Sequence, residues 1–117
     1  MTQQSALVFL DDMLEALQQI EHYVHGLDFT QFSQNRLVID GVIRNLEIVG
    51  EAANNIPDEM KNSAEDIPWN NIIGLRNVLI HEYFGVDLTI VWEIITKDLP
   101  PMKGKIQALV QCLEKTS

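Results

Sequence analysis

Apolar residues recur at spacings of three, four and seven over most of this chain. This period places apolar side chains on one face of a helix, where they pack against neighbouring helices. The pattern predicts a first helix that Ser5 caps at its start and Gly26 ends, because serine favours N-caps and glycine favours the residue after a helix. Its apolar stripe consists of Leu7, Leu10, Leu14, Leu17 and Val24.

A second helix is predicted over about 35–55, where the same period continues until Pro57, a residue that cannot extend a helix. The connector between the first two helices, residues 27–33, contains Phe29 and Phe32. We expect both aromatic rings to fold back onto the core.

Two further helices are predicted near the end of the chain. Asp87 is a suitable N-cap for a helix over 88–99. Pro100 and Pro101 are then expected to break or kink the chain before a last amphipathic helix over 102–115. Neither β alternation nor hairpin turn signals are found. The sequence therefore predicts an all-α protein, an up-and-down bundle of four to five main helices that forms a single domain over residues 1–117.

A polar motif lies within the remaining predicted helix. After a polar, partly helical connection over 58–66, this helix begins near Pro68 and ends near 84–85. It contains Arg76 and, five positions later, His81, with Tyr83 two residues beyond. An arginine always carries charge and needs a partner or water, whereas imidazole titrates near neutral pH and commonly transfers protons. The combination points to a phosphate-handling site.

One face of the motif helix is both polar and small. Asn70, Gly74, Asn77 and His81 follow at i, i+4, i+7 and i+11, so they share this face. Asn77, one turn before His81, is placed to orient the imidazole, and Gly74 permits a second helix to approach closely. The structural alternative is a polar seam, in which Arg76 pairs with Glu47 or Glu51 of the second helix.

Charged and titratable positions outside the motif helix are further candidates for a functional site. The stripe of Asp40, Arg44, Glu47 and Glu51 on the second helix is most often a solvated face, but Arg44 and Glu47 could border a cleft between two subunits. His22 and His25 lack further ligands, and Asp11, Asp12 and Glu15 suit the start of a helix, so none is assigned a role. No metal and no cofactor are expected.

The charge of the chain, −9 from 17 acidic and 8 basic residues, opposes non-specific binding to nucleic acid. It fits a basic protein partner equally well. The sequence contains neither a signal peptide pattern nor an apolar run long enough to cross a membrane. The single Cys112 allows no internal disulfide. A cytoplasmic location is therefore expected.

Residues 76–87, Arg-Asn-Val-Leu-Ile-His-Glu-Tyr-Phe-Gly-Val-Asp, resemble the signature of HepT-like proteins of the HEPN superfamily. The resemblance extends to residues 44–52, 67–69 and 91–100, and the Arg-x4-His-x-Tyr pattern is intact. It implies an all-α bundle that forms homodimers, with the two motifs facing a shared cleft. It also implies a metal-independent endoribonuclease, the toxin of a type VII (HEPN/MNT) toxin–antitoxin system.

Mapped onto this chain, the resemblance makes Arg76 and His81 the catalytic pair, Asn77 a supporting residue and Tyr83 the acceptor of AMP. The donor would be a small MNT-type nucleotidyltransferase, the antitoxin, whose modification of Tyr83 silences the toxin. The alternative is a non-catalytic helical partner and AMP acceptor for such an enzyme.

Overall fold

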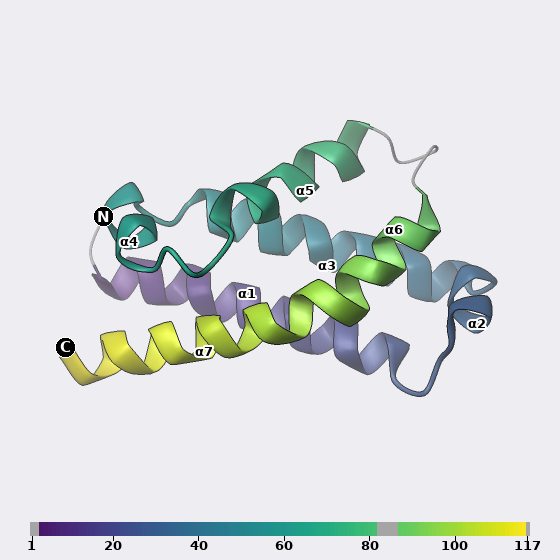
Figure 1. The fold of residues 1–117 in the computed structure, drawn as a ribbon, viewed down its shortest axis with the longest axis horizontal. Helices are drawn as coiled ribbons and strands as arrows, with labels where there is room; N and C mark the ends of the chain where they lie inside the picture. The colour runs from purple at the N-terminus through teal and green to yellow at the C-terminus, as the bar shows by residue number, and fades with distance from the viewer. Residues whose placement is uncertain (1–2, 82–86, 117) are drawn as a thin grey trace.

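Four long helices run up and down along the molecule in the computed structural model, which describes residues 3–81 and 87–116 (Figure 1). They are α1 (Gln3–Val24), α3 (Arg36–Asn54), α5 (Trp69–His81) and α7 (Leu99–Thr116). No strand occurs among the described residues. The predicted all-α, up-and-down bundle is confirmed.

Helix α3 forms the centre of the bundle, because it packs against α1 on one side and α5 on the other, while α7 packs against α1. The apolar stripes predicted from the sequence face this interior. Leu10 and Leu17 of α1 meet Val42, Leu46 and Val49 of α3 in a single buried cluster. Removing such side chains from water is the main stabilising contribution to a bundle of this size.

Most helix boundaries follow the local signals in the sequence. Gly26 has a φ of 76°, a left-handed conformation that glycine adopts without strain, just after α1. Asn35 caps α3 by accepting a hydrogen bond from the Val38 N–H at 3.2 Å. Asp87 likewise accepts from the Thr89 N–H at 2.9 Å. Ser5 is the exception, since α1 already includes it and begins at Gln3.

The connector between α1 and α3 contains a short helix, α2 (Phe29–Ser33). Asp28 and Gln31 form a reciprocal capping box, each accepting a backbone N–H of the other at 2.8 and 3.0 Å. Phe32 is fully buried and lies 5.0 Å from the Trp92 ring, but Phe29 stays 36% exposed at the edge of the same ring. The expectation that both Phe rings enter the core is therefore correct only for Phe32.

The polar connection after α3 contains α4 (Asp58–Ser63), as the sequence predicts. It leads to the first residue of α5, Trp69, whose side chain is buried. The predicted end of this helix near residues 84–85 lies outside the described residues.

The final helical segment bends without breaking. Helix α6 (Leu88–Glu93) continues through a π-helical turn, η2 (Ile94–Asp98), directly into α7. The Leu99 N–H donates a hydrogen bond to the carbonyl of Ile94, five residues back. The backbone hydrogen bonds therefore change from α-helical to π-helical spacing just before the two prolines. Pro100 and Pro101 then fall in the first turn of α7, where a backbone N–H is not required. Of the two predicted alternatives, a break or a kink, the break does not occur, and the helix is continuous with an irregular turn before the prolines.

None of the helices in the described ranges is both long and apolar enough to cross a membrane.

Candidate functional site

The motif predicted from the sequence belongs to α5. Arg76, Asn77 and His81 lie in the last two turns of this helix, which packs along α3. Their side chains and the whole of Tyr83 lie outside the described residues. The structure describes the helix backbone at Arg76, Asn77 and His81 and the surface of the neighbouring helix α3.

Gly74 lies on α5 two residues before Arg76, and no described residue crowds it. A Cβ atom built at Gly74 meets no heavy atom within 4 Å. The close helix–helix approach predicted at this glycine is therefore not made by any described part of the same chain. The space remains available to another molecule.

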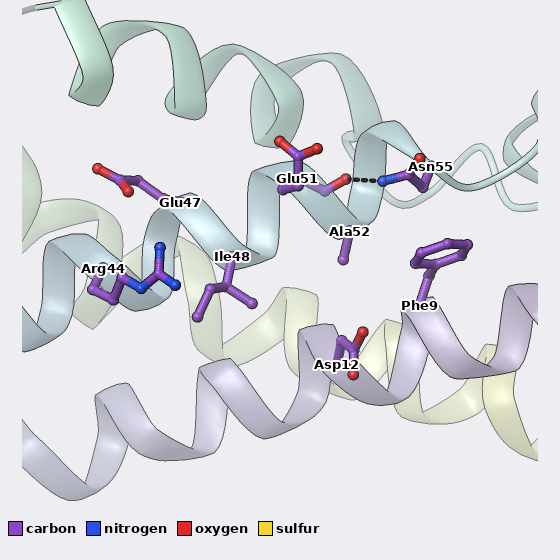
Figure 2. Close-up of a pocket in the computed structure, with 8 residues that line it drawn as sticks. All are labelled: Phe9, Asp12, Arg44, Glu47, Ile48, Glu51, Ala52 and Asn55. Carbon is purple, nitrogen blue, oxygen red and sulfur yellow. Dashed lines mark hydrogen bonds between the residues drawn. The ribbon is translucent and has the colours of Figure 1, made fainter.

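A hollow of about 420 Å³ lies between α1 and α3 on the described surface (Figure 2). Its walls combine carboxylates, an arginine, an amide and apolar side chains, and α5 passes above it. We call it the α1–α3 groove. It is lined by Phe9, Asp12, Arg44, Glu47, Ile48, Glu51, Ala52 and Asn55.

Side chains of opposite character occupy different parts of the groove. Phe9 and Asp12, three residues apart on α1, point toward α3, while the Glu51 side chain extends from α3 toward α5 (Figure 2). The Arg44 guanidinium and the Glu47 carboxylate extend in different directions from α3. The Arg44 guanidinium and the Glu47 carboxylate therefore lie in different parts of the groove.

The charges in the groove are not neutralised by one another. Among the described residues, neither Arg44 nor Glu47 nor Asp12 forms an ion pair. Asp40, the other member of the predicted polar stripe, is instead paired with Arg36 at 3.2 Å, one turn earlier on α3. With no ion pair of its own among the described residues, Arg44 can contact an anionic part of a ligand, while Asp12 and Glu47 can accept hydrogen bonds from another part.

The groove brings together two predicted residues and two that the sequence analysis did not assign. Arg44 and Glu47, which are predicted to border a cleft between two subunits, line this groove within one chain, and the cleft itself stays a prediction. Phe9 and Asp12 were not assigned, although their i, i+3 spacing places them on one face of α1. Only the pairing of α1 with α3 reveals that this face meets Arg44. Within the described ranges, no group of three or more His, Cys, Asp or Glu side chains is arranged to hold a metal ion.

Comparison with known proteins shows which family this chain resembles. A family model described as "Ribonuclease HepT-like" matches residues 13–109. A candidate RNase of Methanocaldococcus jannaschii is 35% identical over 107 residues, 92% of this chain and 98% of that protein. A probable ribonuclease HepT of Thermococcus cleftensis is 40% identical over 101 residues, 86% of this chain and 92% of its own. No solved structure matches.

Proposed function

Because the chain belongs to the ribonuclease HepT-like family, we propose that it is a metal-independent endoribonuclease with Arg76 and His81 as its catalytic pair. The observation that carries the proposal is the extent of the match, which runs through residues 13–109 and includes an intact Arg-x4-His-x-Tyr pattern. Relatives of similar length carry ribonuclease names, which supports the same activity. The whole of residues 1–117 would form the one HepT-like domain.

The residue types suit RNA cleavage without a metal. The reaction needs a base for the 2′-OH proton, an acid for the leaving 5′-oxygen and a cation for the charge of the phosphorane. An imidazole such as that of His81 can act as base or acid, and this kind of catalysis typically contributes ~10²–10⁴ in rate. The Arg76 guanidinium offers a forked donor to the non-bridging oxygens. Asn77 would orient the imidazole.

A homodimer would complete the site, since two copies supply two histidines, one as base and one as acid. The open space at Gly74 supports a close approach on the motif helix, because no described part of the chain fills it. In such a dimer Arg44 and Glu47, on the neighbouring helix α3, would border the shared cleft.

Regulation is the second part of the proposal. The chain would be the toxin of a type VII (HEPN/MNT) toxin–antitoxin system in the cytoplasm. Its partner would be an MNT-type nucleotidyltransferase antitoxin that transfers AMP to the Tyr83 hydroxyl. Tyr83 is two residues from His81, so an attached nucleotide would occupy the cleft and repel RNA by its negative charge.

One observation favours a second candidate. The net charge of −9 opposes binding to RNA and suits a basic protein partner. In that case the chain would be a non-catalytic helical partner and AMP acceptor of the nucleotidyltransferase. The discriminating experiment is incubation of a mixed RNA pool with protein made without the antitoxin, in excess chelator. Cleavage supports the nuclease, and intact RNA with a folded, unmodified dimer supports the acceptor.

A further inference from the structure

Arg44 and Glu47 of the α1–α3 groove would border the proposed catalytic cleft, but no side chain of the groove has a role in the proton transfers proposed for His81. We propose that it is a binding subsite for one nucleotide of single-stranded RNA, with a preference for guanine. The inference deepens the proposed ribonuclease function and rests on it for the choice of RNA as the natural ligand. Its test uses mononucleotides, so it can fail or succeed independently of cleavage.

The dimensions of the groove suit one nucleotide. Its volume of about 420 Å³ lies within the range of pockets that enclose small ligands, roughly 300–1,000 Å³. Arg44 and Ala52 lie on the same side of α3, and the helical rise between them is about 12 Å. That length separates a phosphate at one end from a base at the other.

The base would lie at the end formed by Phe9. This side chain is half-buried, and its ring extends from α1 toward Asn55 on α3 (Figure 2). With Ile48 and Ala52 it offers an aromatic and apolar surface. Bases of single-stranded RNA stack on aromatic side chains in this way, because their faces are apolar and unpaired.

Guanine is favoured by the carboxylate of Asp12, which lies one turn along α1 from Phe9. An ionised carboxylate only accepts hydrogen bonds, through two oxygens. The Watson–Crick edge of guanine presents two adjacent donors, N1–H and the N2 amino group, which match those oxygens. Adenine and cytosine each present one amino group there beside an acceptor, and uracil presents one N–H between two carbonyls. Asp12 should therefore rank guanine first and uracil last.

The phosphate would lie against Arg44. Its guanidinium has no ion-pair partner among the described residues and can donate two parallel hydrogen bonds to phosphate oxygens. The Glu47 carboxylate points away from it, so the two charges can face different parts of a ligand (Figure 2). The excess of carboxylates over arginine in the groove would repel a run of phosphates, which limits the subsite to a single nucleotide.

A basic segment of a protein partner is the competing occupant, since lysine side chains would be attracted to Asp12 and Glu47. Such a segment would match the carboxylates but would leave Arg44 without a counter-charge. The nucleotide satisfies both signs of charge, with phosphate on Arg44 and base donors on Asp12.

The test is calorimetric titration of the full-length His81→Ala protein with 5′-GMP, AMP, CMP and UMP. We expect GMP to bind at least tenfold more tightly than UMP. Arg44→Gln should weaken all four nucleotides by a similar factor, fivefold or more. Asp12→Asn should reduce the GMP-to-UMP ratio several-fold. Asp11→Asn, a neighbouring exposed carboxylate that does not line the groove, should leave the ratio unchanged.

Absence of nucleotide binding, equal affinity for all four, or insensitivity to both groove substitutions would overturn the proposal. Binding of an oligolysine peptide that is weakened by Asp12→Asn, without any binding of GMP, would identify the groove as a protein-docking surface and overturn the proposal. Asp12 and Arg44 are exposed, so the variants should retain the parent's thermal unfolding midpoint. RNA cleavage without GMP binding would contradict this subsite alone, whereas GMP binding without cleavage would contradict only the proposed nuclease.

Discussion

Trp69 donates a hydrogen bond from its indole Nε1 to the carbonyl oxygen of Ala64 at 3.1 Å, and both residues are buried. The bond joins the residue that directly follows α4 to the first residue of α5. It therefore fixes the start of the helix that carries Arg76 and His81.

Trp69→Phe should lower the free energy of unfolding by about 2 kcal/mol, because the buried Ala64 carbonyl loses its donor and the core loses volume. The measurement is chemical denaturation followed by circular dichroism. Trp92→Phe is a matched control, since no hydrogen bond of its indole occurs among the described residues. It should cost about 1 kcal/mol or less. Equal losses at the two positions would show that the Trp69 hydrogen bond contributes nothing.

Two helical glycines should respond differently to alanine. Gly104 has open space where a Cβ would lie, so Gly104→Ala should stabilise the protein by about 0.5–1 kcal/mol through helix propensity. A Cβ at Gly41 would lie 3.0 Å from the Tyr23 ring, so Gly41→Ala should stabilise less. In a Tyr23→Ala background the difference should disappear. Thermal unfolding of both glycine variants, with and without Tyr23→Ala, measures this coupling. If Gly41→Ala still stabilises less than Gly104→Ala in the Tyr23→Ala background, the ring is not the cause.

Gly74→Leu should weaken the proposed homodimer at least tenfold while leaving the monomer folded. The reason is that a Cβ at Gly74 meets no described residue of its own chain, whereas a leucine side chain there would obstruct a second helix. Sedimentation equilibrium measures the dissociation constant. Gly104→Leu, at a second open helical glycine, is the control. An unaltered dimer in Gly74→Leu would place the subunit interface on another face.

Tyr83→Phe should abolish transfer of AMP when the protein is produced together with its nucleotidyltransferase, because only the phenolic oxygen is removed. Intact-mass spectrometry measures the transfer. Tyr23→Phe, which changes a phenol on α1, should leave modification unchanged. Adenylylation that persists in Tyr83→Phe would assign the acceptor to a different residue.

The parts of the fold that follow from the sequence are those encoded locally. Asn35, Asp87 and Gly26 act within three residues of their own position, so their effect can be inferred without the rest of the chain. The capping box of Asp28 and Gln31 was equally local, but α2 was not predicted, since five residues are too few to show a helical period.

Features that depend on distant residues were less predictable. The π-helical turn before Pro100 keeps the helix continuous, and nothing in the order of residues 94–98 distinguishes it from a simple break. The α1–α3 groove requires Phe9 and Asp12 to face Arg44, a relationship set by how two helices pack. Arg44 and Glu47 could be singled out because their stripe is visible on one helix alone.

The most direct test of the account compares cleavage of a mixed RNA pool by the parent protein, His81→Ala and His25→Ala, all prepared without the antitoxin and assayed in excess chelator. His25 is exposed beyond the end of α1, so its substitution controls for loss of an imidazole as such. The account predicts cleavage by the parent and by His25→Ala, and a loss of at least a hundredfold in His81→Ala. Cleavage by His81→Ala at the parent's rate, or none by a folded and unmodified parent dimer, would contradict it.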